Sequence, residues 1–104
     1  MKVLFICNQN LNRSKTAEHL FKDVFTTKSA GLYNEHPVTK EDIGWADGII
    51  VMEDRQREEI GKRFPKEYIK KILSLDIDDV YGYNQPELVE LLNKKMEAIM
   101  PTMQ

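Results

Sequence analysis

The sequence predicts an α/β fold of three layers, a doubly wound, four-stranded parallel sheet with helices on both faces. Short apolar runs alternate along the chain with longer segments whose apolar residues recur at helical spacing. That alternation is typical of strand–helix–strand units, in which the strands lie parallel and the crossovers are right-handed. The length of 104 residues suits a single domain spanning residues 1–104, because a chain of this size buries one modest core.

The first strand and the first helix follow from the apolar pattern near the N-terminus. Residues 3–6 form a continuous apolar run, as expected for a strand buried on both faces of a parallel sheet. From about residue 14 to residue 25, apolar side chains recur at helical spacing and predict an amphipathic helix. Residue 7 therefore ends a strand, and the polar segment after it leads into a helix N-terminus, which favours anions.

The middle of the chain is expected to hold two strands and two helices. Residues 27–30 predict a second strand, and residues 32–37 predict a loop. A short helix is indicated over residues 38–45, and the β-branched run 48–52 predicts a buried strand. The charged stretch 53–63 predicts a solvated surface helix with ion pairs between successive turns.

The last third predicts a fourth strand over residues 69–75 and a terminal helix that begins near Pro86. The apolar stripe of that helix is Leu88, Leu92, Met96 and Ile99. In parallel sheets of this kind, ligands bind beyond the C-terminal ends of the strands, where the strand order reverses. Residue 7 is expected at such a position.

The connection after the first strand carries a motif with a nucleophile. Cys7 is the only cysteine, and five residues separate it from Arg13-Ser14. That spacing lets successive N–H groups curl around one anion, while the guanidinium of Arg13 can hold two phosphoryl oxygens. Ser14 can donate a hydrogen bond to the sulfur and favour its reactive thiolate form. We therefore expect a phosphate-binding loop with Cys7 and Arg13 as catalytic residues. The other residues expected to bind substrate there are Asn8, Gln9, Asn10, Leu11, Asn12 and Ser14.

With these residues the chain resembles the low-molecular-weight protein tyrosine phosphatase family, in a short, minimal bacterial-type form. The matching residues are Cys7, Asn10, Arg13 and Ser14, then Ala17-Glu18, Ser29-Ala30-Gly31 and the segment from Ala46-Asp47 to Met52-Glu53. The resemblance spans most of the chain. It implies hydrolysis of phosphotyrosine or another aryl phosphate monoester through a cysteinyl-phosphate intermediate, with no metal and no other cofactor.

The resemblance also implies a general acid and an aromatic wall for the substrate. Asp79-Val80-Tyr81-Gly82 lies where the family carries an Asp-Pro-aromatic loop. This alignment favours Asp79 as the catalytic acid over its neighbours Asp76 and Asp78. The aromatic residue at the same place is Tyr81, which we expect to contact a substrate ring, with Tyr83 as the alternative.

Two departures from the family keep other functions open. Gln9 stands where glycine is usual and would be strained if its φ were positive, and Lys15 replaces a proline. A distorted loop would suit a weakly catalytic phosphate- or oxyanion-binding regulatory module. Arsenate reductases share the loop and the fold, but a chain with one cysteine would depend on an external thiol.

Composition and charge narrow the partners and the compartment. A net charge of −2 with 31% charged residues offers no basic field for nucleic acid or an anionic membrane. No apolar run approaches the length of a membrane span, and a lone cysteine fits a reducing compartment. We expect a cytoplasmic protein whose partner is a phosphorylated protein or a small aryl phosphate. The sequence leaves its oligomeric state open.

Overall fold

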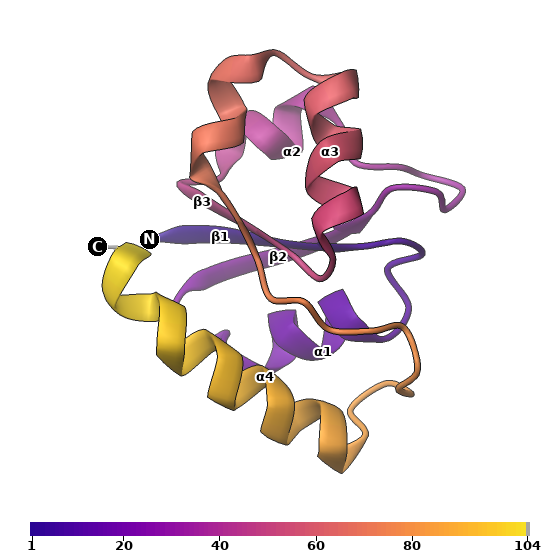
Figure 1. Ribbon diagram of the computed structural model, residues 1–104, viewed down its shortest axis with the longest axis vertical. Helices are drawn as coiled ribbons and strands as arrows, with labels where there is room; N and C mark the ends of the chain where they lie inside the picture. Colours follow the sequence, from indigo (N-terminus) through magenta and orange to yellow (C-terminus); the bar gives the residue numbers. More distant parts are fainter. Residues whose placement is uncertain (104) are drawn as a thin grey trace.

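A computed structural model describes residues 1–103 and contains a four-stranded, all-parallel sheet in the order β2-β1-β3-β4 (Figure 1). The strands are β1 (Lys2–Cys7), β2 (Thr26–Gly31), β3 (Gly48–Val51) and β4 (Ile72–Ser74). The α-helices are α1 (Arg13–Leu20), α2 (Lys40–Trp45), α3 (Asp54–Arg63) and α4 (Pro86–Ile99). Two 3-10 helices are η1 (Lys66–Lys71) and η2 (Met100–Met103). Within residues 1–103, no helix is both long and apolar enough to cross a membrane.

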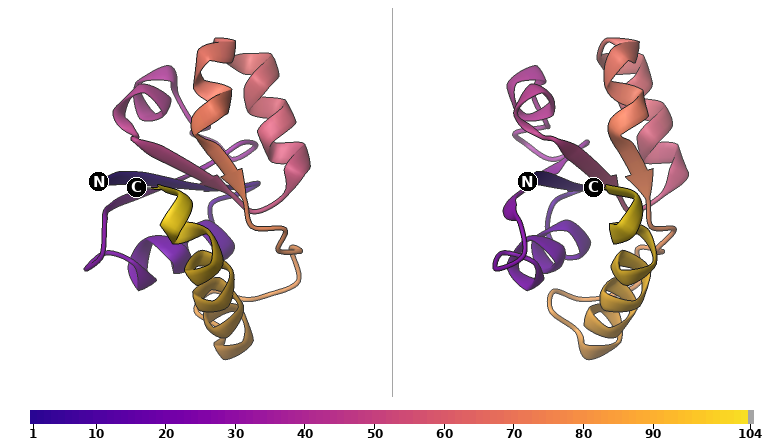
Figure 2. Two further views of the ribbon diagram at one scale, coloured as in Figure 1. Left: turned by 60° about the vertical axis from the view of Figure 1, so that its left-hand side comes forward. Right: turned by 90° about the vertical axis from the view of Figure 1, so that its left-hand side faces the viewer.

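Helices cover both faces of the sheet, as the sequence predicts. The helices α1 and α4 lie on one face, and α2, α3 and η1 lie on the other (Figures 1 and 2). Each face of the sheet has its own hydrophobic core. Alternate residues of β1 pack into one core or the other, because successive side chains of a strand point to opposite faces. Val3 and Phe5 pack with α1 and α4, whereas Leu4 and Ile6 pack with α2 and α3. The three-layer, doubly wound α/β fold is confirmed.

The strand order reverses between β1 and β3. The chain leaves β1 towards α1 on one face of the sheet and leaves β3 towards α3 on the opposite face (Figure 1). The register pairs Cys7 with Gly31 on one side, and Ile6 with Val51 on the other. Cys7 therefore lies at the C-terminal edge of the central strands, beside the point where parallel sheets bind their ligands.

The first helix is shorter than its apolar pattern predicts. It ends at Leu20, and the amides of Val24 and Phe25 both donate to the carbonyl of Phe21 in a turn. Val24 is 56% exposed and adds nothing to an apolar face. The chain must turn here because β2 starts at Thr26, beside the beginning of β1.

The fourth strand is also shorter than predicted. Residues 66–71, half of which we expected in this strand, form η1 instead, and only Ile72–Ser74 pair with β3. Ile69, which looks like a strand residue in the sequence, lies against Gly61 of α3. Its apolar side chain is half-buried against a helix, so periodicity alone could not assign it.

Candidate active site

Residues 8–12 form the connection between β1 and α1, and this loop is tied to the end of β2. The amide of Leu32 donates to the carbonyls of Cys7 and Asn8, at 3.1 and 3.0 Å. Gly31 permits this close approach, since a Cβ on it would lie 3.0 Å from the Asn8 carbonyl oxygen. The start of the loop is therefore held by backbone contacts across the sheet edge.

The Cys7 sulfur faces a serine hydroxyl. Sγ lies 3.0 Å from Ser14 Oγ, and Ser14 Oγ donates to Asn10 Oδ1 at 2.7 Å. A hydroxyl has one proton, so while Ser14 donates to Asn10 the bond to sulfur must be donated by the thiol. A Cys7 thiolate would require Ser14 to turn its proton towards the sulfur. Asn10 thus braces the same hydroxyl that contacts the Cys7 sulfur.

The backbone strain expected at Gln9 falls one residue later. The positive φ in this loop belongs to Asn10, at 55°, and Gln9 is not among the residues with positive φ. Asparagine tolerates the left-handed region better than most residues. The loop therefore accommodates glutamine at position 9 without the cost that the sequence comparison suggested.

Arg13 is buried, with 1% of its surface exposed, and one side of its guanidinium is fully engaged. Its Nη1 donates to the carbonyl of Ile77 at 2.7 Å and lies 3.1 Å from Glu53 Oε2. Its Nε has no hydrogen-bond partner among the described residues and lies 3.6 Å from Asp79 Oδ1. A fixed guanidinium with a free N–H suits an oxyanion ligand.

A small cavity brings the predicted catalytic residues together. It measures about 70 Å³ and is lined by Cys7, Gln9, Leu11, Asn12, Arg13 and Asp79. A space of this volume would hold several water molecules, and hence a phosphoryl group. Within residues 1–103, no hydrogen bond uses the amide N–H of residues 9–12. Those free donors and the N-terminus of α1 favour a bound anion.

The other expected binding residues do not line this cavity. Asn10 and Ser14 bond to each other behind the sulfur, and Asn8 Oδ1 accepts from Gln56 Nε2 at 3.0 Å. Tyr81 is half-buried and packs against the core under α1 and α4. Tyr83 is exposed and lines a separate hollow beside α1. An aromatic contact to substrate therefore stays a prediction for both tyrosines.

Glu53 and Gln56 are the site residues that the sequence analysis missed. We predicted a solvated helix over residues 53–63. This prediction is wrong at the first turn, because Gln56 is buried and Glu53 is mostly buried. Gln56 Oε1 accepts from the amide of Glu53 at 3.0 Å, and its Nε2 lies 3.3 Å from Glu53 Oε2. A signal existed in the sequence: Glu53 follows β3 at the same sheet edge as Cys7.

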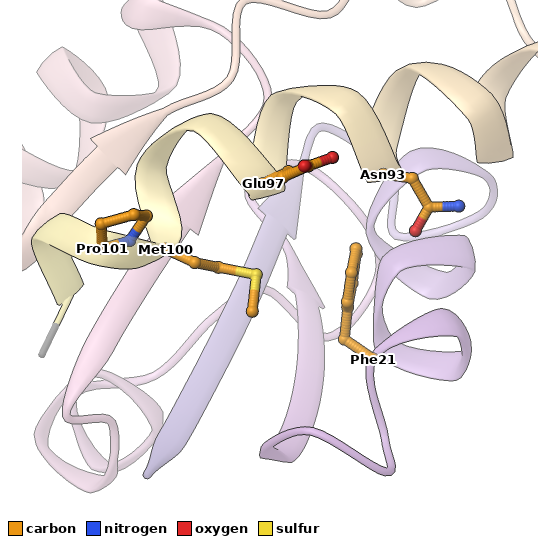
Figure 3. Close-up of a pocket in the computed structure, with 5 residues that line it drawn as sticks. All are labelled: Phe21, Asn93, Glu97, Met100 and Pro101. Carbon is orange, nitrogen blue, oxygen red and sulfur yellow. The ribbon is translucent and has the colours of Figure 1, made fainter.

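A larger, open hollow lies away from this cavity, between the C-terminal ends of α1 and α4 (Figure 3). It measures about 630 Å³ and is lined by Phe21, Asn93, Glu97, Met100 and Pro101. Glu97 is the one titratable residue in that lining, and the lining offers no nucleophile. Of the two, only the cavity at Cys7 combines a nucleophilic side chain with a buried cation.

Comparison with known proteins identifies the fold. No family model matches the sequence, and no curated protein matches it. Among solved structures, the low-molecular-weight protein tyrosine phosphatase from Streptococcus pyogenes is similar with a TM-score of 0.81 and 19% identity, over 99% of this chain and 93% of that chain. The low-molecular-weight protein tyrosine phosphatase from T. tengcongensis has a TM-score of 0.75 and 22% identity, over 99% of this chain and 97% of that chain.

A third similar structure is YwlE arginine phosphatase, in a variant with serine in place of cysteine and a phosphorylated active-site serine. Its TM-score is 0.77 and its identity 22%, over 100% of both chains. The chain has the low-molecular-weight protein tyrosine phosphatase fold. In this phosphatase fold, the loop after β1 and the segment after β4 meet at one edge of the sheet, which is where Cys7 and Asp79 lie.

Proposed function

We propose that the protein is a cysteine-dependent phosphatase that hydrolyses phosphotyrosine or other aryl phosphate monoesters. The observation that carries the proposal is that Cys7, Arg13 and Asp79 line one small cavity. A nucleophile, a buried guanidinium with a free N–H and a carboxyl group are the parts that phosphoryl transfer through a thiol needs.

The first step transfers the phosphoryl group to the enzyme. The Cys7 thiolate attacks phosphorus, an S–P bond forms, and the bond from phosphorus to the aryl oxygen breaks. Asp79 gives its proton to the leaving oxygen, which departs as a phenol. Arg13 Nε and the free amides of residues 9–12 stabilise the charge on the equatorial oxygens.

The second step releases phosphate. Asp79, now a carboxylate, takes a proton from a water molecule as that water attacks phosphorus and the S–P bond breaks. Ser14 donates a hydrogen bond to the departing sulfur, which leaves as the thiolate. In the similar arginine phosphatase structure, the serine that replaces cysteine carries a phosphoryl group. That finding on a relative supports the covalent intermediate proposed here.

The mouth of the cavity favours an aryl substrate. Leu11, which lines the cavity, is 63% exposed, and Val80, next to Asp79, is 72% exposed. Apolar side chains here suit an aromatic ring better than a phosphorylated arginine, the substrate class in the name of the YwlE neighbour. We place the enzyme in the cytoplasm, where its single cysteine would stay reduced, with a phosphorylated protein or a small aryl phosphate as partner.

The test is turnover of p-nitrophenyl phosphate from about pH 4 to about pH 8 in the presence of a chelator. We expect the wild type to turn over and Cys7→Ser to be inactive. Asp79→Ala should lose about 10²- to 10⁴-fold in kcat, the usual contribution of general acid–base catalysis, because hydrolysis of the cysteinyl-phosphate lacks its base. Asp78→Ala is the matched control, because Asp78 is the adjacent carboxylate and does not line the cavity.

Three other results would indicate a different general acid or a different function. A large loss in Asp78→Ala instead of Asp79→Ala would move the acid's role to Asp78. A wild type without turnover, whose Cys7 is nevertheless protected from alkylation by vanadate, would indicate an oxyanion-binding module. Arsenate-dependent oxidation of an added thiol would indicate a reductase.

A further inference from the structure

A buried threonine links the phosphate-binding loop to the segment that carries Asp79. Thr16 lies in the first turn of α1 and is 0% exposed. Its hydroxyl donates to the carbonyl of Asn12 at 2.7 Å and accepts from the amide of Asn84 at 2.8 Å. The first bond is common for threonine in helices. The second joins two segments that are far apart in sequence.

The segment between Ile77 and Asn84 carries Asp79 and is held at both ends by α1. At the near end, the carbonyl of Ile77 accepts from Arg13 Nη1 at 2.7 Å. At the far end, the amide of Asn84 donates to the Thr16 hydroxyl. Arg13 and Thr16 are three positions apart on the helix, so both attachments come from one helix face.

Other hydrogen bonds stabilise the turn at the end of this segment, but they do not connect it to α1 or to the phosphate-binding loop. Gly82 and Gln85 bond to each other in a turn that spans the end of this segment, at 2.8 and 3.2 Å. Asn84 has a φ of 56°, a conformation that is costly unless its surroundings hold it. The bond to Thr16 is the polar contact that fixes this residue to α1.

We infer that Thr16 is a positioning residue, whose hydroxyl sets the place of Asp79 relative to the Cys7 cavity. The inference rests on the proposed function, since it concerns the acid of that reaction. Thr16 does not line the cavity, so its loss should leave phosphoryl binding intact and weaken proton transfer. Small displacements of a catalytic group can cost up to about 10²-fold in rate.

The test compares Thr16→Val with Thr16→Ser and Thr27→Val. Valine has nearly the shape of threonine, with a methyl group in place of the hydroxyl, and the freed amide of the exposed Asn84 can bond to water, so the fold should be kept. Serine restores the hydroxyl. Thr27→Val is the matched control, because the Thr27 hydroxyl also donates to a carbonyl of α1, that of Glu18 at 3.0 Å.

Two substrates separate a positioning role from a structural one. Phenol is a weak acid with a pKa of about 10, so phenyl phosphate needs the proton from Asp79 more than p-nitrophenyl phosphate does. We expect Thr16→Val to lower kcat/KM, which reports the transfer of the phosphoryl group to Cys7 and not the later hydrolysis, about tenfold on phenyl phosphate and less than about threefold on p-nitrophenyl phosphate. Vanadate inhibition should be unchanged, and Thr16→Ser and Thr27→Val should behave as the wild type. In an Asp79→Ala background, Thr16→Val should have no further effect.

Three results would overturn the inference. Equal losses of kcat/KM on both substrates, an equal loss in Thr27→Val, or a further loss in the Asp79→Ala background would each mean that Thr16 only supports the fold. These outcomes leave the proposed function standing, because the wild type is active in all of them. A wild type that hydrolyses neither substrate would overturn the proposed function, and this inference with it.

Discussion

Arg13 is the largest of the fully buried side chains, and two carboxylates share its charge. Glu53 lies 3.1 Å from Nη1 and Asp79 lies 3.6 Å from Nε. A buried cation is costly unless it is paired and hydrogen-bonded. The two partners differ in role: Glu53 is mostly buried and fixes the guanidinium, whereas Asp79 is half-exposed and faces the cavity.

Glu53 does not line the cavity, so its removal should impair catalysis only through Arg13. In Glu53→Ala, Arg13 keeps the Ile77 carbonyl and the more distant Asp79, and we expect kcat/KM for p-nitrophenyl phosphate to fall about 10- to 100-fold. Glu58→Ala, on the exposed side of α3, is the control and should stay within about twofold. Steady-state kinetics of both variants measure this. An unchanged kcat/KM in Glu53→Ala would show that Arg13 does not need Glu53 to hold its orientation.

The sequence names the proposed reacting groups of this site better than the residues that hold them in place. Cys7, Arg13 and Asp79 follow from a loop motif and a family resemblance, and the structure brings all three to one cavity. Gln56 and Thr16 carry no such signal. Their importance comes from contacts with residues far away in the chain, and those contacts exist only once the sheet has formed.

At the scale of elements, Lys71 at the end of η1 holds the C-terminal end of α2. Its Nζ donates to the carbonyls of Ile43 and Ala46, at 2.8 and 2.6 Å. Burial lowers the pKa of Lys71 below 10.5, and the charge of Asp47 offsets part of this effect. The charged form is thus disfavoured in the folded state, although its two hydrogen bonds satisfy the helix end.

We expect Lys71→Met to lower the free energy of unfolding by about 1 to 2 kcal/mol at neutral pH. Since the folded state binds the Lys71 proton less tightly than the unfolded state, the wild type should gain stability as the pH rises towards 10.5. Lys71→Met should lack this gain, so the difference in the free energy of unfolding between the two proteins should widen as the pH rises. Urea unfolding at neutral and alkaline pH measures it. A difference that narrows with pH would contradict the assignment.

The sequence predicts well those elements whose apolar residues all pack in the way that their spacing suggests. The strands β1 and β3 are buried on both faces, and α4 has one clear apolar stripe. The errors lie where an apolar residue packs against an unexpected element or faces solvent. Ile69 packs on α3, and Val24 faces solvent in the turn before β2. Periodicity cannot distinguish these environments.

At the scale of the whole molecule, the reversal of strand order explains why one short loop can act as a site. The segments that follow β1, β3 and β4 converge on one edge of the sheet, bringing Cys7, Glu53 and Asp79 around Arg13. The sequence predicts this edge correctly because the strand pattern and the motif agree. Which hydrogen bonds brace it depends on the packed structure.

The most direct test of the account is a search for the covalent intermediate. The Asp79→Ala variant should be mixed with p-nitrophenyl phosphate, quenched rapidly and analysed by mass spectrometry. Its nitrophenol leaves with little help, but hydrolysis of the intermediate lacks its base, so the intermediate should accumulate. We predict a phosphoryl group on the peptide that contains Cys7. Turnover of the substrate with no phosphoryl group on Cys7, or with one on another residue, would contradict the central claim.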